Sequence, residues 1–191
     1  MVACDTLDMV SKESVRETFP EIDEINDEEL QERVERVLVR AVEESHFDSY
    51  EEIPWWPPYE PVVGDERNPT HVRDVITNAI AIADAVSSRR DVNLDRDTVI
   101  AGAILHDVTK SFELTKDGVT ELDELIPHPH YSVYLLADEG FSLELQHLVL
   151  AHSGQSAVEP KTMEAAIVKH ADRLASQSAF WEAAEQLGLD S

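Results

Sequence analysis

The chain has 191 residues, of which 42% are hydrophobic and 29% charged, and its forty acidic residues against fifteen basic ones give a formal net charge of −25. This length and composition are typical of one globular domain and exclude a disordered chain, and no apolar run approaches the ~20 residues of a membrane-spanning helix. The negative charge also argues against nucleic acid as a partner, because phosphate backbones bind to basic surfaces.

The acidic residues are spread over nearly every predicted helix instead of being gathered in a tail. This distribution favours a surface adapted to high salt, hence a halophilic protein, over an acidic surface that binds one partner. The single cysteine, Cys4, can form neither an intramolecular disulfide nor a thiolate metal site. The first residues lack the basic and apolar segments of a signal peptide, so we expect a cytoplasmic protein.

The N-terminal part is predicted to contain two helices. The first runs from Ser11 to Phe19 and ends at Pro20. The second has Asn26 as its N-cap, with Glu29 placed to complete a capping box, and continues with apolar residues at helical spacing to about Ser45.

A proline-rich segment follows and cannot be a regular helix. It contains the pair Trp55-Trp56, which is either a lid that stacks on a substrate base or a plug over the end of the helical core. We therefore divide the chain into an N-terminal extension, residues 1–67, packed on the core, and one globular unit, residues 68–191.

The rest of the chain is predicted to consist of further helices. One starts near Pro69, the next near Asp95 or Asp97, and another runs from about Pro129 to Gly140. Ser142 caps the helix after that, and the last two span about 160–176 and a segment that stops at Gly188. With almost no strand signal, we expect an all-α fold, a single bundle of about six to eight helices.

The most informative stretch is Ile104–Lys110, which closes an apolar run that reads as a buried helix. Asp107 follows Ala103 by four residues and so lies on the face that packs into the core. A carboxylate there is costly to bury unless it meets positive charge or several donors. In one interpretation Asp107 and His106 form a buried pair bonded to neighbouring backbone; in the other they bind a metal ion.

Several other helices offer metal-binding residues on inward or nearly inward faces, which favours the metal. Imidazole and carboxylate ligands without thiolate suit one or two divalent ions such as Mn²⁺, Fe²⁺, Co²⁺, Ni²⁺ or Zn²⁺, and Mg²⁺ is a further candidate. Lys110 follows His106 by four residues and would place a cation beside the metal, where a phosphoryl oxygen binds. The candidate residues are His71, His106, Asp107, His128, His152 and Asp172.

The order of these residues resembles the His…His-Asp…Asp signature of the HD-domain superfamily of metal-dependent phosphohydrolases, over about 68–175. The segments 128–136 and 151–154 resemble the later histidine motifs of that family. The resemblance implies an all-α HD-domain bundle. It also implies that one metal is held by His71, His106, Asp107 and Asp172, whereas His128 and His152 bind a second metal or the phosphate.

Departures from the family pattern bear on the substrate. Lys110-Ser111 stands where guanosine-tetraphosphate hydrolases carry a Glu-Asp pair, and the Gly-Tyr-Pro motif of cyclic-di-GMP enzymes does not occur. The Leu-His-Asp-x-x-Lys form, together with His152 followed by Ser and Gly, is similar to enzymes that split diadenosine tetraphosphate symmetrically.

The resemblance thus implies a metal-dependent phosphohydrolase that cleaves a phosphate ester or anhydride of a small phosphorylated molecule, which we expect to be a nucleotide. Asp107 and Lys110 would be its catalytic residues, with Asp107 orienting a metal-activated water. One alternative is a non-catalytic HD module that senses a nucleotide or metal; another is a helical scaffold whose inward acids are satisfied internally. The other histidines are assigned structural or exposed positions: His46, His130, His147 and His170.

Overall fold

A computed structural model describes residues 10–55 and 66–186. Within these residues the regular structure is helical, apart from two isolated β-bridges. The predicted all-α fold is confirmed: seven of the described helices have seven residues or more, and α5 and α6 are shorter. The helices are α1 (Lys12–Thr18), α2 (Glu28–Glu43), α3 (Asn68–Arg89), α4 (Arg96–Leu105), α5 (Lys110–Glu113), α6 (Glu121–Leu125), α7 (His128–Asp138), α8 (Leu143–Ala151) and α9 (Met163–Gln186), with the 3₁₀-helices η1 (Pro20–Glu24) and η2 (Tyr50–Glu52).

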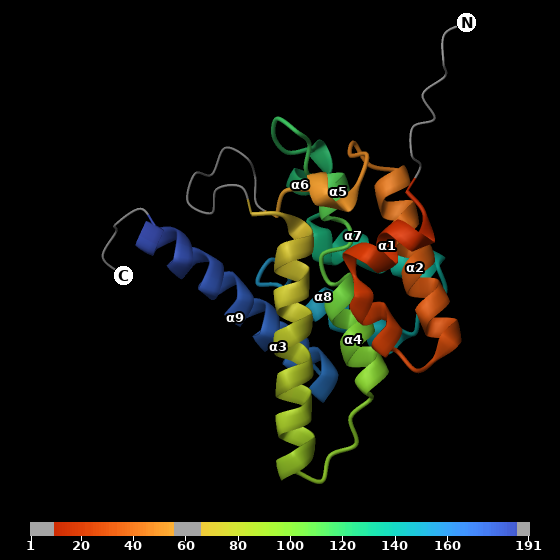
Figure 1. Ribbon diagram of the computed structural model, residues 1–191, viewed down its shortest axis with the longest axis vertical. Helices are drawn as coiled ribbons and strands as arrows, with labels where there is room; N and C mark the ends of the chain where they lie inside the picture. The colour runs from red at the N-terminus through yellow and green to blue at the C-terminus, as the bar shows by residue number, and fades with distance from the viewer. Residues whose placement is uncertain (1–9, 56–65, 187–191) are drawn as a thin grey trace, which may run out of the picture.

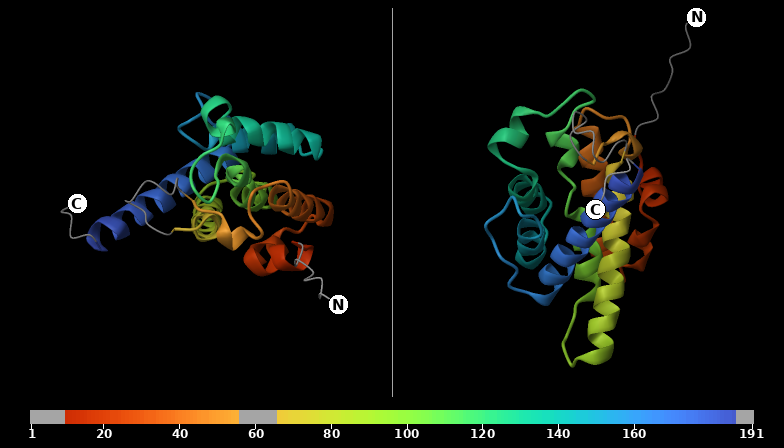
Figure 2. Two further views of the ribbon diagram at one scale, coloured as in Figure 1. Left: turned by 90° about the horizontal axis from the view of Figure 1, so that it is seen from above. Right: turned by 90° about the vertical axis from the view of Figure 1, so that its left-hand side faces the viewer.

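Helix α4 lies in the middle of the bundle, between α2 on one side and α7 and α8 on the other (Figures 1 and 2). It packs against α2, α3, α8 and α9. All residues from 98 to 105 are buried, as the apolar run predicts for a helix surrounded by others. The helix ends at Leu105, so His106 is its C-cap and Asp107 lies in the turn that follows.

The start of α2 differs by one residue from the prediction. Asp27 is the N-cap, and its carboxylate accepts hydrogen bonds from the backbone N–H groups of Glu29 and Leu30. The assignment of Asn26 as the cap, with Glu29 in a capping box, is therefore wrong. Asn26 instead donates its backbone and side-chain N–H groups to Asp97 at the start of α4, a contact across 71 residues that local sequence does not encode.

Helix α9 is one continuous helix of 24 residues, where two helices were predicted. No glycine or proline occurs between Met163 and Gln186 to end it. Its first half packs on the bundle, and its C-terminal half extends away from the body (Figures 1 and 2). The predicted stop at Gly188 lies outside the described residues. In the part of the chain that the structure describes, no helix is long and apolar enough to cross a membrane.

The two ends of the proline-rich segment meet beside the N-terminus of α3. Pro54 and Arg67 form a β-bridge, and the Asn68 N–H donates to the Ile53 carbonyl at 2.9 Å. Trp55 is 3% exposed, whereas Trp56 and the rest of the segment to residue 65 lie outside the described residues. The N-terminal helices share one hydrophobic cluster with the rest of the bundle. The domain division at residue 67 stays a prediction.

Helices α4 and α8 approach each other closely at Gly102. A methyl group at this position would lie 2.5 Å from Cδ2 of Leu148, a side chain with no exposed surface. Such a distance is too short for carbon atoms, so only glycine fits here without a shift of Leu148.

We predict that Gly102→Ala destabilises the protein even though alanine favours helix. Overpacking against Leu148 costs about 1–3 kcal/mol, which exceeds the ~1 kcal/mol that alanine gains over glycine in a helix. Thermal unfolding measures the difference. Gly118→Ala is the matched control, because a methyl group there meets nothing within 4 Å. Equal or higher stability of Gly102→Ala would contradict the close approach.

Candidate metal centre

All six predicted ligand residues come together at one place in the bundle. They come from the first turns of α3 and α7, from the ends of α4 and α8, and from the middle of α9. Five of them are at most 5% exposed, and the Asp172 side chain is 19% exposed. The residues are His71, His106, Asp107, His128, His152 and Asp172.

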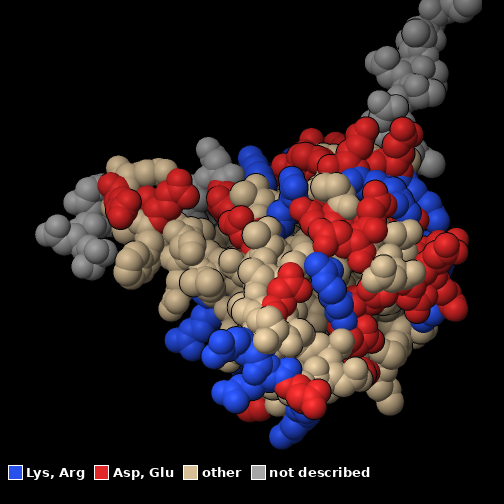
Figure 3. Space-filling view, turned by 60° about the horizontal axis from the view of Figure 1, so that its bottom comes forward, with Lys and Arg blue, Asp and Glu red and all other residues tan. Residues whose placement is uncertain are grey.

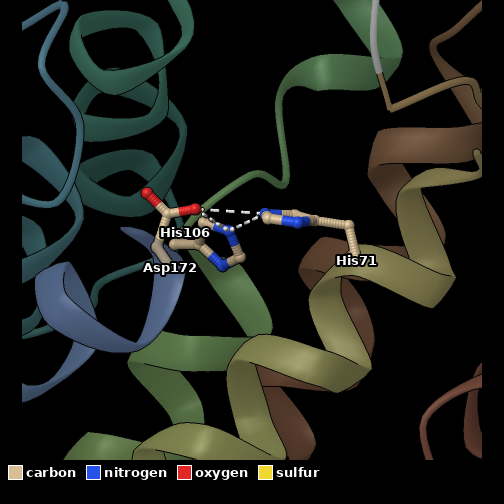
Figure 4. A group of neighbouring side chains, drawn as sticks. All are labelled: His71, His106 and Asp172. Carbon is tan, nitrogen blue, oxygen red and sulfur yellow. Dashed lines mark hydrogen bonds and ion pairs between the residues drawn. The ribbon is translucent and has the colours of Figure 1, made fainter. Parts of the chain in front are cut away.

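One group of ligand atoms joins α3, α4 and α9 (Figure 4). Nε2 of His71 lies 3.1 Å from Oδ1 of Asp172 and 3.4 Å from Nε2 of His106. Nε2 of His106 lies 4.0 Å from the same Asp172 oxygen. The three atoms lie within 4.8 Å of one another, close enough to be ligands of one metal ion.

Asp107 lies between two pairs of imidazoles. Its Oδ2 atom is 3.6 Å from Nε2 of His106 and 3.9 Å from Nε2 of His71. Its Oδ1 atom is 3.2 Å from Nε2 of His128 and 3.6 Å from Nε2 of His152. One carboxylate thus presents a different oxygen to each pair, an arrangement that can bridge two cations.

The backbone determines which nitrogen two of these histidines present to the centre. Nδ1 of His106 donates to the Ala103 carbonyl at 2.7 Å, and Nδ1 of His152 donates to the Val149 carbonyl at 2.6 Å. A carbonyl can only accept, so both Nδ1 atoms carry a proton. In the neutral ring Nε2 then has its lone pair directed toward the centre, ready to bind a metal.

The charges of the centre suit a bound cation. Burial alone would raise the pKa of Asp107, but the neighbouring imidazoles, with a hydrogen bond from His152, hold it well below its usual range. Burial lowers the pKa of His106 to about 4, so this imidazole is neutral. A buried ionised carboxylate next to this neutral imidazole is a suitable pair of ligands for a divalent ion.

Trp55 covers the outer face of His71. The two rings are stacked, with centroids 4.3 Å apart and planes inclined by 19°, and the Phe180 ring lies 6.0 Å from Trp55. Trp55 is therefore packed against the core, as a plug would be, whereas Trp56 lies outside the described residues. The stack holds the His71 ring against rotation.

Lys110 lies beside the centre and contacts an acid that sequence reasoning missed. Its Nζ atom is 3.6 Å from Oε2 of Glu113, which has no exposed surface. Burial raises the pKa of Glu113 to about 7, although the Lys110 charge opposes the shift. The sequence does contain a hint of this buried acid. Glu113 stands between two hydrophobic residues, Phe112 and Leu114, and follows Lys110 by three positions, which places the two side chains on the same face of a helix.

The remaining four histidines lie at exposed or partly buried positions. His46, His130 and His170 are exposed, and Nε2 of the partly buried His147 accepts a hydrogen bond from the Lys161 backbone. None of the four belongs to a described group of metal-binding side chains.

The fold and the centre together define a class: helical proteins with buried histidines and aspartates that can hold metal ions. The family model of the HD domain matches residues 69–177, more than half of the chain. The chain therefore belongs to the HD domain family, and the resemblance found in the sequence is confirmed.

Two curated relatives are similar to part of the chain. A dihydroneopterin 2',3'-cyclic phosphate phosphodiesterase from Methanocaldococcus jannaschii is 31% identical over 112 residues, 56% of this chain and 45% of the relative. The 3'-5' exoribonuclease YhaM from Bacillus subtilis is 34% identical over 119 residues, 54% of this chain and 36% of the relative. The chain thus matches less than half the length of each. No solved structure matches it.

We predict that metal affinity falls in acid. Burial lowers the pKa of His152, but the hydrogen bond to Asp107 and the charges of both aspartates outweigh it and leave the pKa raised. A proton on Nε2 excludes a metal, so affinity decreases as the pH falls through this raised pKa. Mn²⁺ titrations between about pH 5.5 and 8.5 measure it. In His152→Asn the dependence should flatten; an unchanged profile would contradict the assignment.

We also predict that Trp55→Leu weakens metal binding at His71. A stacked ring pair contributes about 0.5–1.5 kcal/mol, so its loss should lower affinity roughly 2–10-fold through greater freedom of the imidazole. Mn²⁺ binding measures the change, and Trp55→Phe, which retains a ring, should lose less. Affinity equal to that of the unsubstituted protein in Trp55→Leu would show that the stack does not position His71.

Proposed function

We propose that this protein is a metal-dependent phosphohydrolase that cleaves a phosphate ester or anhydride of a small nucleotide-like molecule. The observation that carries the proposal is Asp107, buried between two pairs of imidazoles with one oxygen toward each. Both curated relatives, by their names, act on phosphodiester bonds. A helical scaffold with internally satisfied acids would not require four imidazole nitrogens to face the same carboxylate.

The distances in the centre support one assignment of ligand roles. His71, His106 and Asp172, with Oδ2 of Asp107, would hold one divalent ion. His128 and His152, with Oδ1 of Asp107, would hold a second ion or a phosphoryl oxygen.

A bound divalent ion lowers the pKa of a coordinated water and neutralises phosphoryl charge. Asp107 would orient the attacking water by accepting a hydrogen bond from it. Lys110 would add positive charge beside the phosphate. The ligand set, imidazole and carboxylate without thiolate, favours Mn²⁺, Fe²⁺, Co²⁺, Ni²⁺ or Zn²⁺ over Mg²⁺, which prefers oxygen.

The surface charge supports a small substrate and a salty environment. Figure 3 shows acidic side chains spread over the visible face, with lysine and arginine scattered among them and gathered along one edge. A chain of net charge −25 repels a long polyanion, so we propose a small phosphorylated molecule and not RNA as the substrate. We also propose that the protein works in a cytoplasm of high ionic strength, where the Debye length falls to ~3 Å at 1 M salt.

The test is metal analysis of the purified protein coupled to a phosphate-release screen at high salt. Phosphomonoesters, cyclic phosphodiesters and dinucleoside polyphosphates serve as substrates. We expect His106→Ala to lower kcat/KM by more than about 100-fold, because ligand loss removes the metal-dependent step. His170→Ala, an exposed histidine two residues from Asp172, is the control and should retain activity.

Two results would count against the proposal. Metal-loaded protein that hydrolyses none of these substrates would contradict it. Tight nucleotide binding without turnover would instead support the non-catalytic HD module that senses a nucleotide.

Activity is predicted to rise with ionic strength. Carboxylates on the surface repel an anionic substrate at low salt, and screening removes this repulsion. The measurement is kcat/KM from low salt to molar KCl. A steep fall over this range, with the fold intact by circular dichroism, would show that the charge has another purpose.

A further inference from the structure

Three imidazoles of the centre differ in what their Nδ1 atoms contact. His106 and His152 are the C-caps of α4 and α8, so each has the carbonyl of a preceding turn within reach. His128 is the first residue of α7, so no earlier turn of its own helix holds its Nδ1, and within the described residues that atom makes no hydrogen bond to a carbonyl. Its Nδ1 must find another acceptor or remain without one.

The acceptor that the fold provides is Glu113. Oε2 of Glu113 lies 3.3 Å from Nδ1 of His128, while Nε2 of the same ring faces Oδ1 of Asp107 at 3.2 Å. Nδ1 of His128 and both Glu113 oxygens are buried, and none of the three atoms makes a hydrogen bond of good geometry within the described residues. The His128 backbone N–H and Lys110 also lie close enough to the Glu113 carboxylate to oppose the rise of its pKa. A buried donor and a buried acceptor this close satisfy each other after a small rotation of either side chain.

The surroundings hold both groups in place. The Thr109 hydroxyl donates to the His128 carbonyl at 3.2 Å and contacts the Ser132 hydroxyl at 2.8 Å, which fixes the start of α7 against the turn after α4. Glu113 also contacts Lys110, so one carboxylate joins the cation to His128. Lys110 and His128 are the two groups that the proposed function places beside the phosphate.

We propose that Glu113 is a positioning residue: it accepts the Nδ1–H of His128 and thereby directs Nε2 toward the position shared with Asp107 and His152. This rests on the proposed function, since it assigns His128 to a second ion or phosphoryl group. A carboxylate behind a ligating imidazole fixes the ring and strengthens it as a ligand. Loss of Glu113 should weaken the His128 side of the centre and spare the side formed by His71 and Asp172.

The experiment compares Glu113→Ala and Glu113→Gln in the full chain with Mn²⁺ as the probe, its free fraction followed by electron paramagnetic resonance. We expect Glu113→Ala to weaken the ion on the His128 side by about 10–100-fold. Glu113→Gln keeps an oxygen that can accept from Nδ1, and it should recover most of the affinity. The matched control is Glu164→Gln, a buried glutamate that accepts from the Asp95 backbone in another part of the bundle.

A second measurement reports on the ring itself. In Zn²⁺-loaded protein, nuclear magnetic resonance should show a slowly exchanging His128 Nδ1–H proton shifted downfield by the carboxylate, and this signal should disappear in Glu113→Ala. The effect of Glu113→Ala on Mn²⁺ affinity should also vanish when His128→Ala is already present, because the two residues act as a unit.

The outcomes separate this inference from the proposed function. Unchanged Mn²⁺ affinity in Glu113→Ala, an unchanged Nδ1–H signal, or a loss that persists beside His128→Ala would each overturn the role of Glu113 while leaving a metal centre in place. Failure of the unsubstituted protein to take up Mn²⁺ or Zn²⁺ would instead overturn the proposed function and the positioning role with it.

Discussion

The structure depends on burying the charge of Asp107. A carboxylate that is 5% exposed in a helical core loses most of its hydration, which is costly unless other groups replace the water. Four imidazole nitrogens within 3.9 Å of its oxygens do so, and they are also the ligands that a divalent ion prefers. The same contacts therefore stabilise the apoprotein and prepare it for a cation.

Most of these side chains meet because helices begin or end at the centre. Because α4 and α8 terminate at the centre, carbonyls in their last turns orient His106 and His152 through hydrogen bonds to Nδ1. Where a helix begins at the centre, as α7 does at His128, the orienting group must come from elsewhere in the chain. The centre thus combines local backbone contacts with long-range side-chain contacts.

This difference explains which features could be predicted. The six ligand residues are recognisable because their order and their positions on apolar stripes are properties of the sequence. Their roles as ligands remain a proposal, but their meeting place follows from packing those stripes together. The continuity of α9 could also have been predicted, since no glycine or proline lies between 163 and 186, but two helices were expected there.

Other features depend on contacts between distant segments. Asn26 donates hydrogen bonds to Asp97 and does not cap α2, and the His71 ring stacks on Trp55. Local periodicity identifies neither Asp97 nor Trp55 as a partner. Glu113 escaped notice for the same reason, because its buried position is defined by the start of α7, fifteen residues further along the chain.

The contact of Gly102 with Leu148 reaches beyond stability. Each residue precedes a centre histidine by four positions, Gly102 before His106 and Leu148 before His152, so the contact lies one turn beneath the two rings. The ring centroids are 5.0 Å apart, a spacing set by how deeply one helix settles onto the other. The absence of a side chain at Gly102 therefore helps to set the distance between two proposed ligand rings, His106 facing one oxygen of Asp107 and His152 the other.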